Sequence, residues 1–460
     1  MLSRLRRFFE RLSPGMWVIL VLAVGSSGIV LALGKPERHG MPFWIFNKVH
    51  RTTYRPFVDR WNEAHPDSRV DLILIQIDAY ERRLLAGVTA ETPVGDLLET
   101  ERRLAARSFL GPKESVGFYD LTDRLRAEGL LDTINAPSFA PWTAHGRIYG
   151  LPHDVHPVLL VYRADLIEAA GIDLQKVETW DEFARVLRPL MQDFDGDGRP
   201  DRYPLNGWPT NQLFLEGLLR QGGGRYFDDA DRPMLDDDLN AQLLAQIISW
   251  TVGPDRICVD VQDQVASGNQ QRRDGTMLCQ LMPDWMVGQW KKDIPDLGGK
   301  VKLMPLPAFT PGGRRTSVWG GTMLGISKKA PDFEKAWSFV RTIYLSPEVA
   351  EATFRGIGIV TPVKTHWNLP VFDEPDPYFC GQPSGRLFIN QAPNVPIRSS
   401  SAFERLALER TVVAAIALHD YAESTGIFDA AALVPEAKRL LGIAQAEVRR
   451  EMERNIFINQ

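Results

Sequence analysis

The residues from Asp193 to Asp201 have the types and the spacing of a cation-binding loop. Aspartates alternate along the segment, and Gly198 permits the sharp turn that such a loop needs. With a main-chain carbonyl added, the segment matches the first nine positions of a calcium-binding loop, but position twelve is Pro204 rather than glutamate. The bidentate ligand must therefore come from elsewhere, or the site is weakened. We expect a structural calcium ion, with a solvated acidic turn as the alternative. The expected ligands are Asp193, Asp195, Asp197, the carbonyl of Arg199, and Asp201.

A second polar cluster, His153, Asp154 and His156, precedes an apolar run that begins at Leu159. Two histidines and one aspartate could bind a metal ion, but their spacing is not a recognised zinc pattern and no cysteine is near in the sequence. We interpret them instead as hydrogen-bonding groups at a strand edge, which either face a ligand or cap the local structure.

Five tryptophans stand beside Gly, Pro, Asn or Asp rather than on helical stripes. Sugar rings have apolar C–H faces and polar rims, so a carbohydrate pocket needs flat aromatic platforms with fixed carboxylates and amides around them. Each of the five is a candidate platform, and a core position is the alternative for each. They are Trp44, Trp142, Trp208, Trp285 and Trp319.

Catalytic signatures are missing from the sequence. It contains no G-x-S-x-G, no H-E-x-x-H and no G-x-x-x-x-G-K-[ST]. The glycines at 222–224 do not follow a strand and open a helix as a phosphate cradle requires. We therefore predict no catalytic residues.

The elements that would position these residues alternate between strand and helix. Residues 41–47 read as a strand that runs into a loop, and Tyr54, Val58 and Trp61 fall at helical spacing. The nearly continuous aliphatic run at 70–77 suits a strand buried on both faces, as in a parallel sheet covered by helices. Strand and helix alternation of this kind predicts an α/β fold. Further expected elements are strands at 159–162 and 323–326, and helices at 180–191, 333–344 and near the C-terminus.

Length and composition limit the function further. A chain of 460 residues exceeds what one hydrophobic core usually organises, which predicts two lobes. The net charge of -5 provides no strong single-sign field, so we expect no nucleic-acid partner. The three cysteines, Cys258, Cys279 and Cys380, allow one disulfide at most and are more simply explained as small buried hydrophobes.

The N-terminus has the pattern of an export signal. Four arginines at positions 4, 6, 7 and 11 precede an uncharged run from Met16 to Leu33. The run is long enough to cross a bilayer, and the arginines would keep the N-terminus in the cytoplasm. Both cleavage near Gly34 and a retained transmembrane anchor are compatible with this pattern. We expect residues 1–40 to be a basic tip followed by an anchor or signal, with the rest of the chain in the periplasm or extracellular space.

Several segments resemble the extracellular solute-binding proteins of bacterial ABC importers, in the maltose-binding-like (family 1) group. Their order and spacing carry the resemblance, which extends over most of the chain after residue 40. The segments are Trp44 to Asn47 before the helix at 54–62, Asp96 to Glu99, Gly150-Leu151-Pro152 leading to Tyr162-Arg163-Ala164-Asp165-Leu166, Thr179-Trp180-Asp181-Glu182-Phe183, Trp319-Gly320-Gly321, and Gly356 to Pro362.

The resemblance implies a type II periplasmic-binding-protein fold with two α/β lobes joined by crossover strands. It places the first lobe at 41–158 plus 303–345, and the second at 159–302 plus 346–460 with the C-terminal helices. It further implies a monomer that binds a carbohydrate, with an ABC permease as partner. Calcium loops occur in the group. The segment 92–96 departs from the group's usual Gly-x-x-Pro-Asp form, and no lipid-modified cysteine follows the apolar run.

Ligand contacts implied by the resemblance come from loops of both lobes. They are Trp44, Asn47, Glu99, His153, Asp154, His156, Trp285, and Trp319 with Gly320; Trp208 joins them as a loop tryptophan with asparagines nearby.

Two rival functions stay open at this point. A glycoside-acting enzyme would need paired carboxylates such as Glu99 and Asp154 at about 5 to 9.5 Å across the scissile bond. A tethered sensor would present its liganded and unliganded lobes to a signalling partner. Capture of a carbohydrate for import is the leading hypothesis.

Overall fold

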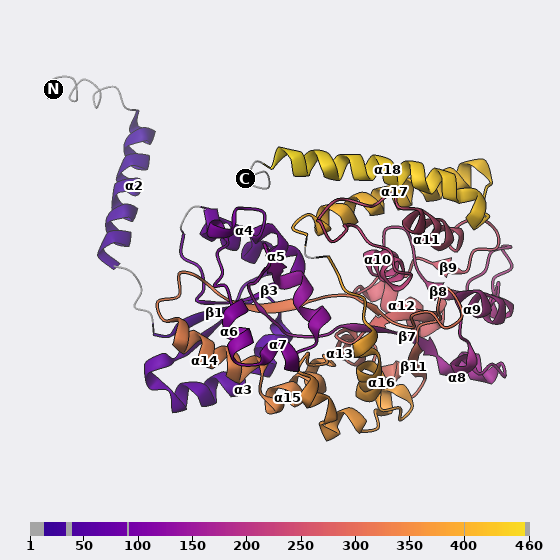
Figure 1. Cartoon of the computed structure of the whole chain (residues 1–460), viewed down its shortest axis with the longest axis horizontal. Coiled ribbons are helices and arrows are strands. Elements are labelled where there is room, and N and C mark those ends of the chain that lie inside the picture. Colours follow the sequence, from indigo (N-terminus) through magenta and orange to yellow (C-terminus); the bar gives the residue numbers. More distant parts are fainter. Residues whose placement is uncertain (1–12, 34–38, 90–91, 400, 456–460) are drawn as a thin grey trace.

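The computed structural model describes residues 13–33, 39–89, 92–399 and 401–455 (Figure 1). The basic residues of the predicted export signal lie outside these ranges. Helix α2 (Pro14–Leu33) stands apart from the rest of the molecule (Figure 1). Within the described ranges, no helix combines the length and the apolarity that crossing a membrane requires. The transmembrane anchor expected within residues 1–40 stays a prediction.

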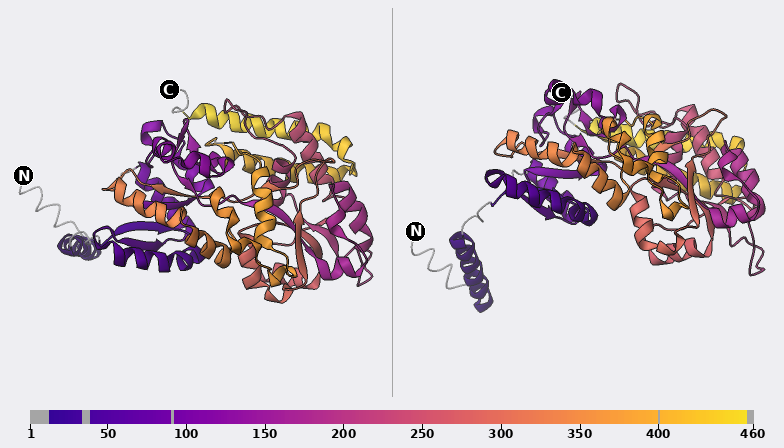
Figure 2. Two further views of the ribbon diagram at one scale, coloured as in Figure 1. Left: turned by 60° about the horizontal axis from the view of Figure 1, so that its bottom comes forward. Right: turned by 90° about the horizontal axis from the view of Figure 1, so that it is seen from below.

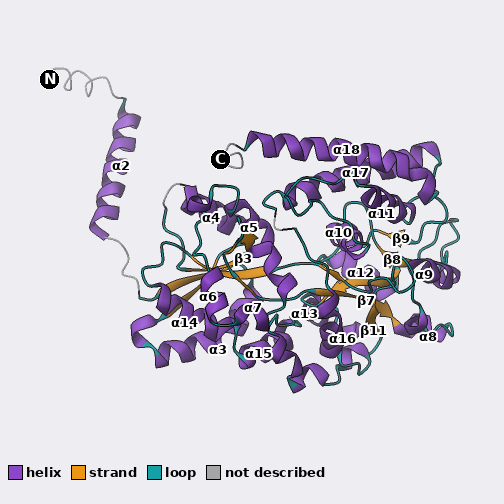
Figure 3. Ribbon diagram, in the orientation of Figure 1, coloured by secondary structure: helices purple, strands orange, loops and turns teal. Residues whose placement is uncertain are grey.

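Two β-sheets form the centres of two lobes (Figure 3). The sheet of the first lobe has the strand order β2-β1-β3-β13-β6. Strand β1 runs parallel to β2 and β3, whereas β13 is antiparallel to β3 and β6. The aliphatic runs expected to form strands at 41–47 and 70–77 thus pair in register from Met41 with Val70 onward. The strands are β1 (Met41–Ile45), β2 (Val70–Leu74), β3 (Leu97–Glu101), β6 (Leu151–Pro152) and β13 (Thr322–Ile326).

Helices cover the first sheet because each has one apolar stripe. In α3 (Lys48–Ala64), the residues Tyr54, Val58 and Trp61 are buried, as their helical spacing predicts. They pack with the sheet and with α14 (Phe333–Tyr344) in one core. The remaining elements of this lobe are α4 (Ile77–Thr89), α5 (Arg102–Ser108), α6 (Thr122–Ala127), α7 (Leu130–Thr133), α15 (Pro347–Ile357), and the short hairpin β4 (Thr143–Ala144) and β5 (Arg147–Ile148).

The second sheet has the order β11-β7-β10-β8-β9, with β12 also paired to β7. All seven residues of β7 and all seven of β10 are buried, which explains why their sequences are apolar apart from Arg163 and Gln280. The strands are β7 (Pro157–Arg163), β8 (Tyr203–Asn206), β9 (Cys258–Val259), β10 (Met277–Pro283), β11 (Val301–Pro305) and β12 (Ser317–Val318). The helices are α8 (Ala164–Ala169), α9 (Trp180–Leu187), α10 (Gln212–Gln221), α11 (Asp238–Ser249), α12 (Ala266–Asp274), α13 (Met286–Asp293) and α16 (Ser384–Gln391).

The chain passes between the lobes three times, at 152–157, 318–322 and 357–371, the last between α15 of the first lobe and Val371 of the second core. We call these stretches the first, second and third crossing segments. The predicted return to the first lobe at residue 303 is wrong, because β11 and β12 pair with β7 and only β13 rejoins the first sheet. The predicted change of lobe at residue 346 is also early, since Val349 of α15 belongs to the first core.

Helices α17 (Glu404–Thr425) and α18 (Ala430–Arg454) form a hairpin along one side of the molecule (Figures 1 and 2). They pack on the second lobe through residues such as Leu418 and Leu441. The end of α18 reaches back to the first lobe, where the Asn455 side chain donates to the carbonyl of Leu110 at 3.0 Å. All three cysteines are free, with Cys258 and Cys279 buried and Cys380 exposed.

Candidate ligand-binding site

A cavity of about 850 Å³ lies between the lobes and is bordered by all three crossing segments and the end of α15. Its size falls in the range of sites that enclose a small-molecule ligand. The first lobe contributes residues that follow β1 and β3, and the second lobe contributes the starts of α10 and α13. Lining side chains with polar groups include Asn47, His50, His156, Asn211, Gln212, Gln264 and Gln289.

Two of the predicted tryptophan platforms line this cavity. Trp285 immediately precedes α13, and Trp319 lies on the second crossing segment. The indole N–H of Trp285 donates to the Trp319 carbonyl at 3.2 Å, and the guanidinium of Arg102 lies 5.3 Å from the centre of the Trp319 ring. Both indoles are half-buried. The arrangement offers a ligand two aromatic surfaces that are held by the protein before the ligand arrives.

His50, which the sequence did not point to, lines the cavity from the first turns of α3. Its Nδ1 lies 2.7 Å from the Glu99 carboxylate, whose other oxygen accepts from the Tyr344 hydroxyl at 3.1 Å. Burial opposes ionisation of Glu99, but the charge and hydrogen bond of His50 outweigh it and lower the pKa of this carboxyl. Glu99, predicted to contact the ligand, is fully buried and instead orients His50.

His156 lines the cavity from the first crossing segment, and both of its ring nitrogens face carboxylates. Nε2 lies 2.7 Å from Asp154 and Nδ1 lies 2.7 Å from Asp284. Burial disfavours the imidazolium, but the two carboxylates outweigh it and raise the pKa of His156 to about 9. Burial likewise opposes ionisation of Asp154, yet His156 and His153 lower the pKa of its carboxyl. Asp284 stands directly before Trp285 but was not among the predicted site residues.

Other predicted contacts do not line the cavity. Trp44 lies inside β1 and packs edge-on against Tyr80, with ring centres 5.9 Å apart, whereas Phe46 beyond the strand end reaches the cavity. His153 is buried and its Nε2 lies 2.8 Å from the Tyr54 hydroxyl. Asp154 is buried beside the two histidines. Trp208 packs against His419 within the second lobe, with ring centres 4.9 Å apart.

Asn47, Trp285, Trp319 and Gly320 do line the cavity, together with His156. Asn47 also caps α3, since its side-chain oxygen accepts from the Val49 N–H at 2.8 Å.

A buried ion-pair network joins the lobes beside the cavity. Arg102, at the start of α5, makes a two-pronged contact with Glu216 of α10, at 3.2 and 2.6 Å. Glu216 also lies 3.6 Å from Arg220, which in turn pairs with Glu404 of α17. Burial opposes ionisation of Glu216, but the arginines outweigh it and lower the pKa of the carboxyl. The network fixes α5 of one lobe against α10 of the other.

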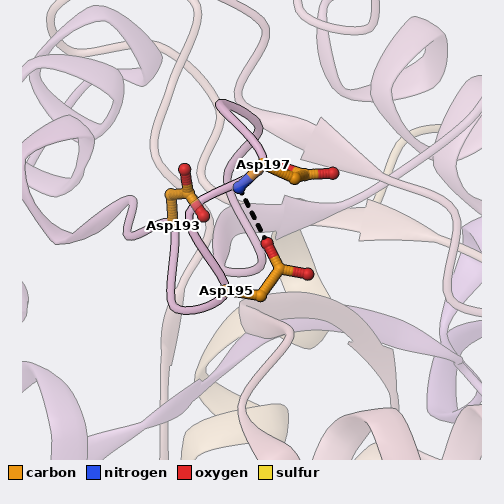
Figure 4. Close-up of side chains that lie close together, drawn as sticks. All are labelled: Asp193, Asp195 and Asp197. Atoms are coloured by element: carbon orange, nitrogen blue, oxygen red, sulfur yellow. Dashed lines mark hydrogen bonds between the residues drawn. The ribbon is translucent and has the colours of Figure 1, made fainter.

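The aspartate loop on the second lobe brings three of its expected ligands together (Figure 4). Oxygens of Asp193, Asp195 and Asp197 all lie within 4.8 Å of one another, and all three side chains are exposed. The Asp193 carboxylate accepts from the main-chain N–H groups of Gly198 and Gly196, at 2.8 and 2.7 Å, and these bonds lower its pKa. Both glycines have positive φ, at 86° and 79°.

The remaining two expected ligands are placed differently. The Asp201 carboxylate turns back into the loop and accepts from the Phe194 N–H at 2.8 Å, outside the three-carboxylate group. The main-chain N–H of Arg199 donates to Asp197 at 2.8 Å. Three hard oxygen donors are the ligand type that calcium prefers, and the loop geometry fits the first half of such a site.

The chain is similar to known proteins in sequence and in fold. A family model described as bacterial extracellular solute-binding protein matches residues 47–350. An arabinooligosaccharide-binding protein of Halalkalibacterium halodurans is 24% identical over 347 residues, which cover 73% of this chain and 74% of that protein. A lactose-binding protein of Rhizobium radiobacter is 24% identical over 363 residues, covering 74% and 78%.

Among solved structures, the sugar-binding protein MalE of Xanthomonas citri is similar with a TM-score of 0.71 at 19% identity. The alignment covers 90% of this chain and 99% of that chain. At this identity the likeness demonstrates a shared two-lobed α/β fold, which agrees with the two sheets and three crossing segments described above.

Proposed function

Because the chain belongs to the bacterial extracellular solute-binding protein family, we propose that it is the substrate-binding component of an ABC-type importer. In this proposal it binds an oligosaccharide in the cavity between its lobes. The single observation that carries the proposal is the pairing of two aromatic platforms, Trp285 and Trp319, with amide side chains around one interlobe cavity. Stacking on sugar C–H faces and hydrogen bonding to hydroxyls need this combination.

The volume and chemistry of the cavity favour a neutral ligand larger than a single sugar ring. Asn211, Gln212 and Gln289 present neutral amides. The lining carboxylates of Glu101 and Asp263 are paired with Arg103 and Arg272, and Lys292 and Asp293 add one charge of each sign. Several relatives carry names of oligosaccharide binders, including arabinooligosaccharide and maltotriose. We therefore favour an oligosaccharide of a few residues.

The rival hypothesis of a glycoside-acting enzyme has little to support it. Glu99 and Asp154, the carboxylates that it would use, are both buried behind histidines and are not among the residues that line the cavity. We propose binding without catalysis.

We propose location and partners from the family. In this proposal the protein acts outside the cytoplasm as a monomer and delivers its ligand to a membrane permease. The apolar run from Met16 to Leu33, with arginines before it, supports export, either as a cleaved signal or as a retained tether.

The test of this function is titration calorimetry of the protein against arabinotriose, maltotriose and lactose. We expect tight binding of at least one oligosaccharide, with the sugar recovered intact after long incubation. Cleavage of the bound sugar would favour the enzyme, and failure of every sugar to bind would refute the carbohydrate proposal.

We also propose that the aspartate loop binds a structural calcium ion, through Asp193, Asp195 and Asp197 with Arg199 and Asp201 as further oxygen donors. The support is the grouping of three exposed carboxylates, whose oxygens lie within 4.8 Å of one another at the spacing of a calcium-binding loop. A ligand that binds only the folded state raises its stability by mass action. Added calcium should therefore raise the melting temperature of chelator-treated protein, and Asp193→Asn together with Asp195→Asn should abolish that rise. An equal rise in this double variant would contradict the site.

A further inference from the structure

The main chains of the three crossing segments meet at one place. The Val155 N–H of the first segment donates to the Val360 carbonyl of the third, at 3.2 Å. The Trp319 N–H of the second segment donates to the His156 carbonyl of the first, at 3.3 Å. The three connections between the lobes are therefore hydrogen-bonded to one another.

Asp284, at the end of β10, holds this junction from the second lobe. It is fully buried. One oxygen accepts from the Trp285 N–H at 2.8 Å and lies 2.7 Å from His156 Nδ1, while the other accepts from the Val360 N–H at 2.8 Å. A single carboxylate thus contacts the first and third crossing segments and a tryptophan platform of the cavity.

His156 completes the junction. Its ring lies between Asp284 and Asp154, and its φ of 55° is a left-handed conformation that few residues other than glycine adopt. Such strain persists only where the surroundings hold it in place. The second crossing segment packs against the same ring, because a Cβ added at Gly320 would lie 2.9 Å from both His156 Cδ2 and Trp285 Nε1.

This geometry restricts how the lobes can move. A change in the angle between the lobes must alter main-chain dihedrals somewhere along the crossing segments. If the change separated His156 from Asp284, it would leave a buried carboxylate without its charged partner, which is costly. The bending must therefore occur on either side of the junction, with the junction itself moving as a unit.

We propose that His156 and Asp284 are the positioning residues of the hinge, which hold the three crossing segments together and so set the relative orientation of the lobes and of Trp285 and Trp319. This inference rests on the proposed function in one respect: the orientation of the lobes matters because the protein captures a ligand between them. The geometry itself can be measured without any ligand.

The test measures distances between the lobes in the full chain by pulsed electron spin resonance. One spin label is attached to Arg185→Cys on α9 of the second lobe, in a Cys380→Ser background, and the other to Asp132→Cys on α7 of the first, because Cys258 and Cys279 are buried. The doubly labelled parent should give one narrow distance distribution. Asp284→Asn should broaden this distance distribution. An amide has one accepting oxygen, so it cannot accept hydrogen bonds from both the Val360 N–H and His156 Nδ1 as the two carboxylate oxygens do.

A second variant covers the case in which Asp284→Asn fails to fold. His156→Asn keeps a residue that tolerates positive φ, but its side chain is too short to bridge the two carboxylates. It should broaden the distribution in the same way. Nitrogen chemical shifts of the His156 ring should also show that Asp284→Asn makes the imidazolium lose its proton at lower pH than in the parent.

The matched control is Asp376→Asn. Asp376 is also a buried carboxylate that accepts from a main-chain N–H, that of Tyr378 at 3.1 Å, and from the Ser384 hydroxyl at 2.7 Å, but its contacts stay within the second lobe. This variant should lower the melting temperature and leave the interlobe distribution narrow.

The proposal is overturned if the folded hinge variants keep the narrow distribution of the parent, or if the control broadens it equally. Titration of the same samples with maltotriose and arabinotriose tests the proposed function separately. Absence of binding would refute the carbohydrate ligand, whereas the hinge is decided by the distance distributions alone.

Discussion

Individual side chains at the cavity divide into those that can meet a ligand and those that hold them. Trp285 and Trp319 line the cavity, and so does His50, whose Nδ1 lies 2.7 Å from the Glu99 carboxylate. Glu99 and Asp154 do not line the cavity but contact the histidines that do, His50 and His156. These neighbouring histidines lower the pKa of both carboxyls in spite of burial. Substitutions in the two groups should therefore have different effects.

Removal of an aromatic platform should weaken binding without unfolding the protein. We expect Trp285→Ala or Trp319→Ala to cost roughly 1 to 3 kcal/mol of binding free energy, as the loss of a stacked aromatic contact does at interfaces. Calorimetric titration with the tightest-binding oligosaccharide measures the loss. Trp208→Ala is the matched control, because this tryptophan packs on His419 away from the cavity. Unchanged affinity in both platform variants would show that these tryptophans do not contact the ligand.

His156 should make stability depend on pH in the alkaline range. Its pKa rises from an ordinary value near 6.5 to about 9 in the folded protein. The imidazolium therefore stabilises the fold fully below about pH 6.5, and this contribution is lost as the pH rises through about 9. We expect the free energy of unfolding of the parent, measured relative to His156→Asn, to fall by on the order of 3 kcal/mol between pH 6 and pH 10. Parallel curves for the two proteins would contradict the assignment.

At the scale of elements, the ends of strands and the crossing segments bring the site together. The second crossing segment needs glycine where it passes the first, since Gly320 has a φ of 104° and faces His156 and Trp285. The ion pair of Arg102 with Glu216 adds a direct link from α5 to α10.

Gly320→Ala should disturb both stability and binding. The added methyl group meets two ring atoms at 2.9 Å and the backbone conformation is unfavourable for alanine, so we expect a loss of about 1 to 3 kcal/mol in stability. Chemical denaturation and sugar titration measure the two effects. Gly312→Ala is the control for backbone strain alone, because Gly312 also has positive φ, at 71°, but open space around its Cβ position. Equal losses in the two variants would show that contact with His156 is unimportant.

At the scale of the whole molecule, the two lobes and their junction predict a change of shape. If both lobes contact one ligand, the ligand must favour the arrangement in which those contacts are made. The radius of gyration from solution scattering should fall when a saturating oligosaccharide is added to the parent. Trp285→Ala should need more sugar to show the same fall. Tight binding with no compaction would contradict closure of the lobes on the ligand.

Family membership, the α/β class and a two-lobed architecture could be predicted from the sequence, and the comparisons confirm the resemblance. These properties depend on local patterns. Buried strands such as β7 are largely apolar runs, and the stripe of Tyr54, Val58 and Trp61 requires one apolar helix face. The grouping of Asp193, Asp195 and Asp197 is local in the same sense, since it arises within one short loop.

The lobe boundaries and the roles of the polar residues were decided only by tertiary structure. Residues 303–318 stay in the second lobe because β11 and β12 find their partner in β7, a pairing between distant segments. Trp44 and Trp319 both stand near turn-forming residues, yet one packs in a core and the other lines the cavity. Asp284 meets His156 and Val360 across 128 and 76 positions of the chain, and no local spacing encodes such contacts. The sequence alone therefore determined which kind of protein this is, whereas long-range packing determined which side chains line the cavity and which ones join the crossing segments.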